Sequence, residues 1–467
     1  MIVRVKVTGM SRRTTDFLLI GFPAIIPLYA PFGAVGWQNR DAARKNGRKP
    51  VGLRRFYETF FLFPAHSAAS RHLGQSMLNR RLLRIKVMQT LYALHQANQA
   101  TIQMAHDGIA DLFQPDLNSM EPQDKRQLEG NRKLAALLLD DAVKTDLPAD
   151  DADTPRPILK AVNDGLLFYQ IRRKKDKQQV SQQLTQTVQA LYDDLIRVLT
   201  LLPELGRAAA LDRDRTHRNV DETPFPLESS LNDNVIINAL DAHGPLQNEA
   251  LRRTISWTND DDRQFIRNAY RDVLRADDTY RAYCEQPTHT TDDDQAMVQY
   301  VLRSLIFKDE TFRNHLAEID LSWTENSEVV RSLAIKTLKS YQTVAGLTLE
   351  PLTDDWDEDQ YFLNTLFDNA VDHDREYEVL LTDQLQNWDV ERVAMLDQII
   401  LKLAVCELLN FPAIPVKVSI NEYIELAKGY STPKSGKFVN GILDNLSEKL
   451  IASGQLRKSG RGLLDNK

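Results

Sequence analysis

The stretch from Trp388 to Ile451 decides the fold, and it reads WDVERVAMLDQIILKLAVCELLNFPAIPVKVSINEYIELAKGYSTPKSGKFVNGILDNLSEKLI. It contains three helical patterns separated by two short turns, NFPAIP at 410–415 and YSTPKSG at 430–436. In the first pattern, apolar residues recur at the spacing of one helical face, and proline then ends the helix because its ring cannot continue the hydrogen-bond ladder. The stretch therefore predicts three consecutive helices.

The second and third patterns carry their own boundary signals. Ser419 and Glu422 are spaced as a capping box at a helix start, and Gly429 suits a helix end. The second helix has an apolar stripe at helical spacing, formed by Ile420, Tyr423, Ile424 and Ala427. The third carries Phe438, Val439, Ile442, Leu443, Leu446 and Leu450. Three adjacent amphipathic helices indicate a helical bundle.

Composition extends this all-α prediction to the rest of the chain. Of 467 residues, 42% are hydrophobic, and only 19 are glycine and 19 proline, which favours helices over a turn-rich β fold. The net charge of −7 argues against a protein that coats nucleic acid with its whole surface, so any such contact needs a local basic patch. The two cysteines, Cys284 and Cys406, cannot form a disulfide framework, which favours a reducing cytoplasm.

Residues 1–76 differ in composition from everything that follows. They hold 12 basic against 3 acidic residues, and Phe17 to Gln38 is free of charge. That apolar run contains three prolines and three glycines, which disfavours a membrane-spanning helix. We expect the natural protein to begin near Met77 and residues 1–76 to be non-native or disordered leader sequence. A genuine N-terminal extension and a membrane segment are the alternatives.

An internal repeat occupies the middle of the chain. Residues at offsets of 0, 5, 12 and 15 recur in three copies, which are Phe265–Tyr270–Asp277–Tyr280, Met297–Leu302–Asp309–Phe312 and Phe362–Phe367–Asp374–Tyr377. An aspartate at the third place suits the N-cap between two helices, because its carboxylate accepts a free backbone N–H. Tryptophans 323 and 388 then follow the last two copies at the same distance. The repeat predicts a helical unit used more than once, each copy burying its apolar face against neighbours.

Two groups of cations stand out as candidates for contact with an anionic partner. Arg80, Arg81, Arg84 and Lys86 begin a helical pattern, where positive charge opposes the helix dipole. The second turn and its flanks hold Lys428, Lys434, Lys437 and Phe438, which suit phosphate attraction and base stacking. A solvated helix face explains the first group equally well, and a core position explains Phe438 equally well. The run Arg172–Lys177 is best explained as a solvated helix face.

These segments resemble a known family. VKVSINEYIELAKGYSTPKSGKFVNGILD (416–444) is similar to the signature of the NusB family of bacterial transcription antitermination factors, P-x-K-V-x-I-N-E-x-[IV]-E-[LI]-A-K followed by S-x-K-F-V-N-G-[IV]-L-D. LDQIILKLAVCELL (396–409) and RRLLRIKVMQTLYAL (80–94) resemble the helix before this signature and the arginine-rich first helix of the family. The resemblance covers residues 78–96 and 361–446, and residues 100–355 look like the expansion of Bacteroidetes-type members.

The resemblance implies an RNA-binding factor that recognises boxA-type sites of ribosomal RNA transcripts together with NusE, within an RNA polymerase antitermination complex. Arg80, Arg81 and Arg84 fall on the RNA-binding first helix of the family, and Lys434, Lys437 and Phe438 on its second RNA-contacting segment. Asp397 falls where the family places an acidic residue facing NusE. Lys434 occupies a position that is often acidic, so direct RNA affinity is expected to be higher here.

The resulting prediction is an all-α, NusB-like helical bundle enlarged by inserted repeated helices. We expect a basic helix and helical region at 77–147, an inserted region at 158–350, a NusB-like core at 355–453 and a flexible tail at 454–467. We expect no metal, cofactor or enzymatic activity, because no phosphate-binding loop, dinucleotide motif or metal-ligand spacing occurs. A fused RNA cytosine methyltransferase, found with some NusB-like domains, would need a Gly-rich cofactor loop and a nucleophilic Cys beyond the last helix. The remaining alternative is a helical scaffold for protein partners with weak or vestigial RNA binding.

Overall fold

The computed structural model describes residues 79–116, 118, 122–216, 228–343, 346–384 and 393–466. The chain divides into two units, Met1–Gln75 and Ser76–Lys467, and the described residues all belong to the second. The predictions about residues 1–76 and about Trp388 therefore lie outside the described residues. Within those ranges the chain forms helices and one isolated β-bridge, which confirms the all-α prediction.

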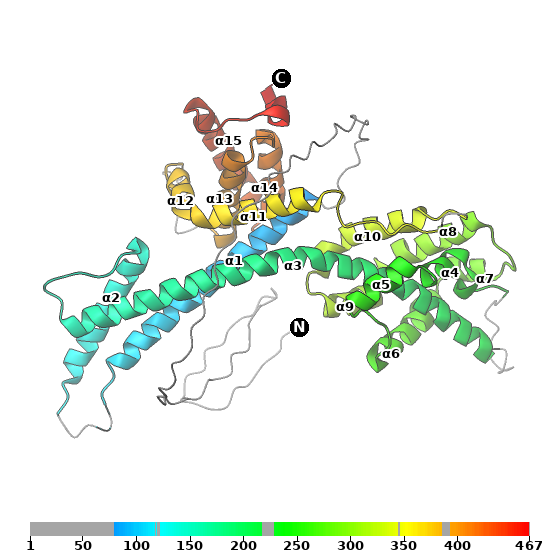
Figure 1. Ribbon diagram of the computed structural model, residues 1–467, viewed down its shortest axis with the longest axis horizontal. Coiled ribbons are helices and arrows are strands. Elements are labelled where there is room, and N and C mark those ends of the chain that lie inside the picture. Colours follow the sequence, from blue (N-terminus) through cyan, green and yellow to red (C-terminus); the bar gives the residue numbers. More distant parts are fainter. Residues whose placement is uncertain are drawn as a thin grey trace, which may run out of the picture. The chain divides into compact units, whose positions relative to one another are not determined.

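Three helices form the N-terminal part, α1 (Arg80–Leu112), α2 (Lys125–Thr145) and α3 (Arg156–Thr216). α1 and α3 lie side by side, and α2 packs against both (Figure 1). The far end of this arrangement has a small core of its own, built around Ile109, Leu139, Ile158 and Tyr169. α3 continues through Pro203 to a total of 61 residues, so it reaches well beyond α2.

A second group of short helices, within residues 231–339, packs around the second half of α3 (Figure 1). We call this group the extension. Its helices are α4 (Val235–Asp241), α5 (Gly244–Arg252), α6 (Asp260–Ala269), α7 (Asp278–Cys284), α8 (Thr291–Tyr300), α9 (Glu310–Ile319) and α10 (Trp323–Lys339). A 3₁₀ turn, η1 (Leu231–Asp233), precedes them. The extension shares one large buried core with the C-terminal helices.

The C-terminal helices gather around the beginning of α1 (Figure 1). They are α11 (Trp356–Asp372), α12 (Asp374–Thr382), α13 (Met395–Asn410), α14 (Val416–Tyr430) and α15 (Ser435–Ala452). α11 and α13 contact α1 directly, and α13, α14 and α15 pack on one another. The three helices predicted from the deciding stretch are therefore present and adjacent.

The internal repeat corresponds to real structural units, although its copies differ. Asp277 and Asp309 are N-caps as predicted, accepting bonds from the backbone N–H of Tyr280 (2.9 Å) and Thr311 (2.8 Å). The third copy was predicted wrongly, because Asp374 is the first helical residue of α12 and instead binds Lys402 (2.8 Å). The first two copies also contain π-helical turns, η2 (Tyr270–Leu274) and η3 (Val301–Ile306), that the third lacks.

The C-terminal tail, which the sequence analysis expected to be flexible, is folded in residues 454–466. Leu456 is buried, and the ammonium group of Lys458 donates to the backbone oxygens of Leu408 (3.0 Å) and Phe411 (3.1 Å). These oxygens lie at the C-terminal end of α13, where unpaired carbonyls and the helix dipole favour a cation. A short helical segment, η5 (Gly460–Asn466), then contacts α14. Lys458 therefore anchors the tail, and the described residues 454–466 are not the flexible tail that was predicted.

Candidate nucleic-acid interface

The basic beginning of α1 is held in place by its own cap. The side chain of Asn79 accepts a bond from the backbone N–H of Arg81 (2.9 Å), which satisfies one of the free donors at the helix start. Arg80 pairs with Glu358 of α11, and its guanidinium lies over the ring of Phe362 at 5.1 Å from the ring centre. The Arg80 and Glu358 side chains are both partly exposed, so this pair lies on the surface.

Arg84 lies one turn further along α1 and is buried. Its guanidinium makes two bonds with the carboxylate of Glu407 on α13, at 2.7 and 2.8 Å. Glu407 also accepts bonds from the hydroxyls of Ser419 (2.7 Å) and Tyr423 (3.0 Å) on α14. Burial alone would lower the pKa of Arg84, but the charge of Glu407 outweighs this and raises it. Arg84 therefore stays charged inside the fold, and the bonds to Glu407 satisfy its buried guanidinium.

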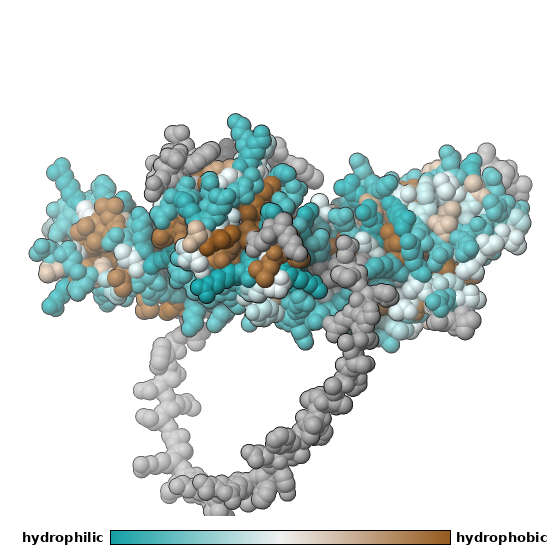
Figure 2. Space-filling model, turned by 90° about the horizontal axis from the view of Figure 1, so that it is seen from above, coloured by the Kyte–Doolittle hydropathy of each residue, from teal (hydrophilic) through white to brown (hydrophobic). Residues whose placement is uncertain are grey.

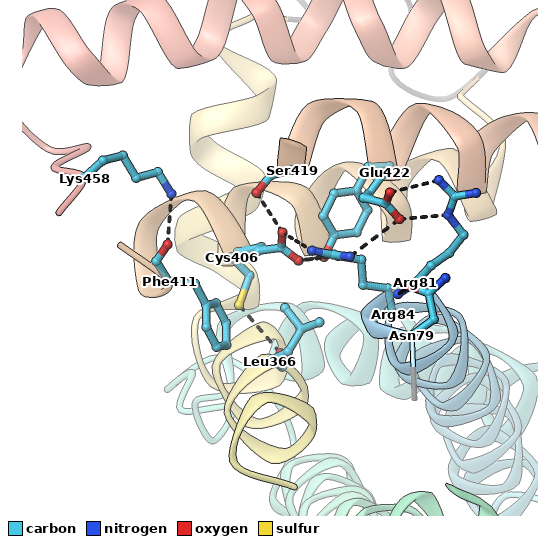
Figure 3. A network of polar contacts seen from close by, with 11 residues as sticks. Asn79, Arg81, Arg84, Leu366, Cys406, Phe411, Ser419, Glu422 and Lys458 are labelled. Carbon is cyan, nitrogen blue, oxygen red and sulfur yellow. Dashed lines mark hydrogen bonds and ion pairs between the residues drawn. The ribbon is translucent and has the colours of Figure 1, made fainter. Parts of the chain in front are cut away.

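This buried cluster of Arg84, Glu407, Ser419 and Tyr423 locks α1, α13 and α14 together. In Figure 3, Arg81 and Arg84 project from α1 toward α14, where Glu422 meets them, while Ser419 of α14 donates to the carboxylate of Glu407. The predicted capping box of Ser419 and Glu422 is wrong, because α14 begins earlier, at Val416, and both side chains are used in these contacts. The cluster fixes the position and direction of the basic end of α1.

Arg81 lies at the edge of the exposed face of α14. Its guanidinium makes two bonds with Glu422, at 2.8 and 2.9 Å, and the Arg81 side chain is 43% exposed. The bond to Arg81 lowers the pKa of Glu422, so the pair is ionised at neutral pH. Glu425, one turn further along α14, binds the ammonium group of Lys428 (2.7 Å). Glu422, Glu425 and Lys428 recur at helical spacing, so they line one exposed stripe of α14.

The other edge of this stripe is the beginning of α15. Lys434 is the N-cap residue of α15, and Lys437 lies in its first turn; both are exposed. Neither makes an ion pair within the described part of the chain. The aliphatic stem of Lys428 crosses Gly436, where an added Cβ would lie 2.9 Å from its Cγ. Phe438 is half-buried against the core, so it offers only part of its ring to a ligand.

The structure therefore brings most, but not all, of the predicted cations to one surface. Arg81 of α1, Lys428 of α14 and the Lys434–Lys437 pair of α15 lie around the exposed stripe of α14. We call the surface formed by Arg80, Arg81, Glu358, Glu422, Glu425, Lys428, Lys434 and Lys437 the basic face. Arg84 is excluded from it, because its side chain is only 4% exposed and its charge is already paired.

Lys86 is also absent from the basic face, contrary to expectation. It is 2% exposed, and its ammonium group has no hydrogen-bond partner in the described part of the chain. Burial lowers the pKa of Lys86, and the nearby carboxylates of Glu325, Asp320 and Asp194 oppose that effect. These acids belong to α3 and to the α9–α10 region, so Lys86 faces the extension rather than a surface ligand.

Asp397, the predicted contact for a partner, is buried at the start of α13. It is 5% exposed, and one carboxylate oxygen accepts a bond from the hydroxyl of Ser435 (2.7 Å) at the start of α15. The other oxygen has no partner among the described residues. In this conformation Asp397 positions the beginning of α15 and is not presented to another protein.

Sequence reasoning missed the acidic members of this site. Glu407 could have been noticed, because it is the one acidic residue within the mainly apolar run IILKLAVCELL of α13. Glu422 was recognised only as a capping residue, and Glu425 had no distinguishing pattern. The partners of Arg80 and Arg84 lie 278 and 323 residues away in sequence, which no local periodicity can connect.

The fold and the basic face define an all-helical protein with an arginine-bearing helix clamped against a C-terminal helical bundle. A family model described as the NusB family matches residues 328–448, from within α10 to within α15. The chain belongs to the NusB family, and it carries a transcription antitermination domain of that family. The prediction of a NusB-like bundle enlarged by further helices is confirmed, as is the prediction that the chain is not an enzyme.

Curated relatives support this membership. The transcription antitermination protein NusB of Salinibacter ruber is 39% identical over 123 residues, which cover 26% of this chain and 76% of the relative. That of Chloroherpeton thalassium is 35% identical over 144 residues, covering 29% and 68%, and that of Bacillus mycoides is 36% identical over 104 residues, covering 22% and 80%. No solved structure matches. The likeness thus concerns about a quarter of the chain.

Two further findings bear on the expected class of protein. Within the described ranges, no helix combines the length and apolar character needed to cross a membrane. No group of three or more His, Cys, Asp or Glu residues in the same ranges is arranged to hold a metal ion. Cys284 and Cys406 are buried, and burial raises the pKa of their thiols to about 11 and about 12. Both cysteines are therefore core residues, as the sequence predicted.

Proposed function

We propose that this chain is an RNA-binding transcription antitermination factor that acts on boxA-type sites of ribosomal RNA transcripts together with NusE. On this proposal it joins an RNA polymerase antitermination complex in the cytoplasm. The observation that carries it is the exposed Lys434–Lys437 pair, which lies inside the segment matched by the family on a helix that packs against α14, the helix that Arg81 of the basic helix also binds. Such a surface suits the phosphates of a single strand.

We propose only those predicted residues whose side chains are at least partly exposed as direct RNA contacts. Arg80, Arg81, Lys428, Lys434 and Lys437 have exposed or partly exposed side chains on the basic face. Phe438 remains a candidate for stacking through the exposed part of its ring. Arg84 is proposed to act indirectly, by fixing the end of α1, and Lys86 is no longer proposed as a contact. For NusE, the proposed role of Asp397 is likewise indirect, through the position of α15.

The test is a titration of boxA-type RNA at several salt concentrations, with and without NusE. We expect binding that tightens when NusE is added and weakens as salt rises, because released counterions drive it. Lys434→Asp should lose affinity, since it places a negative charge on the basic face. Lys336→Asp, an equal charge change at an exposed position of α10, is the matched control. Salt-independent binding, or equal losses in both variants, would contradict the proposal.

The second candidate function is a scaffold for protein partners. Large apolar side chains are exposed on the helices distant from the basic face, including Leu112, Leu137, Leu167 and Ile171. Figure 2 shows hydrophobic surface at this end, which Figure 1 shows to be formed by α2, the end of α1 and the start of α3. If the scaffold is the main function, Leu137→Glu will abolish activity in the cell while RNA affinity stays unchanged. Deleting residues 100–355 is not informative, because this range includes α3, which packs against α1.

A further inference from the structure

Carboxylates occupy the basic face together with its cations. Three of its five cations are already paired: Arg80 with Glu358, Arg81 with Glu422 and Lys428 with Glu425. Only Lys434 and Lys437 make no ion pair among the described residues. The net charge of the face is therefore +2, although its cations alone would supply +5. This surface is much less attractive to a polyanion than its lysines and arginines suggest.

An RNA phosphate that approaches a paired cation must displace the carboxylate. The pair of Arg81 is the stronger obstacle, because it has two hydrogen bonds and the Glu422 side chain is only 20% exposed. The pair of Lys428 is weaker, because both side chains are about half exposed. After displacement, each carboxylate remains beside the phosphate and repels it. Each pair thus lowers the affinity that comes from phosphate contacts alone.

We propose that Glu422 and Glu425 determine specificity by suppressing sequence-independent RNA binding on the basic face. This inference rests on the proposed function, and it adds a role for acidic residues to it. Phosphate contacts supply essentially all of non-specific binding, whereas base contacts fix the register of a specific complex. Neutralising most of the cations leaves too little phosphate attraction for arbitrary RNA. RNA whose bases are recognised can then displace the carboxylates.

The proposal predicts the salt dependence of binding. For single strands, the logarithm of the affinity falls with the logarithm of salt concentration by about 0.7 for each phosphate neutralised. Two unpaired cations give a slope of about −1.4 for non-specific RNA, whereas five available cations would give about −3.5. Releasing Lys428 alone should make the slope steeper by about 0.7. The number of available cations can therefore be measured without knowing the structure of the complex.

The experiment uses the full chain and two RNAs of equal length, one containing a boxA-type site and one scrambled. Glu425→Gln releases Lys428 and removes a repelling charge, while the glutamine side chain keeps its size. Glu448→Gln is the matched control, because it removes the same charge from an exposed position of α15 about three helical turns beyond Lys437. Glu422→Gln serves as a second variant, with circular dichroism to check the fold, since Glu422 also lies 3.6 Å from Arg84.

We expect Glu425→Gln to bind the scrambled RNA about two- to fivefold more tightly, with a steeper salt slope. Binding of the boxA-type RNA should change less, because base contacts supply part of its affinity and fix its register, so fewer of its phosphates can shift toward the released Lys428. The ratio of the two affinities therefore falls, and Glu448→Gln leaves it unchanged. Equal gains for both RNAs, no gain, or the same gain in Glu448→Gln would overturn the proposal. Absence of RNA binding by the unmodified chain would instead contradict the proposed function itself.

Discussion

The buried pair of Arg84 and Glu407 allows a sharp test of how the basic helix is held. We consider Glu407→Leu, Arg84→Met and the double variant. Glu407→Leu leaves the guanidinium of Arg84 buried and unpaired, and it removes the acceptor of the Ser419 and Tyr423 hydroxyls. Arg84→Met leaves the carboxylate without its counter-ion. The double variant removes both charges and fills the space with apolar side chains of similar size.

The expected size of the effect follows from burial. The side chains of Arg84 and Glu407 are 4% and 0% exposed, so solvent does not screen either charge after its partner is lost. Removing one member of such a pair costs about 3–5 kcal/mol, whereas replacing both by apolar residues is often close to neutral. The double variant should therefore be more stable than either single variant. We expect a coupling energy of about 2–4 kcal/mol in the double-mutant cycle.

The measurement is urea denaturation of the three variants, combined with hydrogen exchange of the amides in α1 and α14. The single variants should shift the unfolding midpoint to lower urea and expose the first turns of α1 to exchange. The double variant should recover most of both losses. A loss below about 1 kcal/mol in Glu407→Leu, or losses that simply add in the double variant, would refute the reasoning that a buried ion pair locks α1.

Three further predictions concern other buried or anchoring groups. Burial, reinforced by Asp320, raises the pKa of Asp194 from 3.8 to about 8, so the folded state holds a proton that the unfolded state releases between these values. Stability should therefore fall as pH rises through that window, and Asp194→Asn should flatten this dependence in urea denaturation at a series of pH values. Lys458→Met should speed hydrogen exchange in residues 455–466 while the global unfolding midpoint stays nearly unchanged, because only the tail loses its anchor. Ser435→Ala should lower stability by about 1–3 kcal/mol in the same assay, since it removes the described hydrogen bond to the buried carboxylate of Asp397.

Sequence periodicity predicted the helices of the deciding stretch because it reports which side of each helix is buried. The apolar stripes of 395–450 became the buried faces of α13, α14 and α15, with small shifts at their ends. Periodicity does not report what a charged residue touches. Arg81 and Arg84 look equivalent in the sequence, yet one is 43% and the other 4% exposed. The difference arises from Glu422 and Glu407, which only the tertiary fold brings near.

The tail and the repeat also depend on contacts that local sequence patterns do not report. A polar, glycine-containing segment such as 454–466 reads as flexible by composition, and its order depends on the carbonyl groups that α13 offers to Lys458. Likewise, an aspartate at a fixed offset predicts a cap only if the preceding helix ends in the same place. In the third copy α11 continues to Asp372, so His373 takes the capping position. Local patterns therefore predicted which units exist better than where each one ends.

The role of the extension can be inferred from its contacts with α1, because α1 contacts both the C-terminal helices and the extension. Arg80, Arg81 and Arg84 join it to the C-terminal helices, whereas Lys86 and Gln89 face the extension. The amide of Gln89 donates to Glu325 of α10 at 3.4 Å. Burial is the main cause that raises the pKa of Tyr430 at the end of α14, and the charge of Glu325 raises this pKa further. The extension therefore borders the same helices that carry the basic face. A change in the packing of α10 would reach the residues proposed to contact RNA through α1 and the end of α14, without any contact between the extension and the RNA.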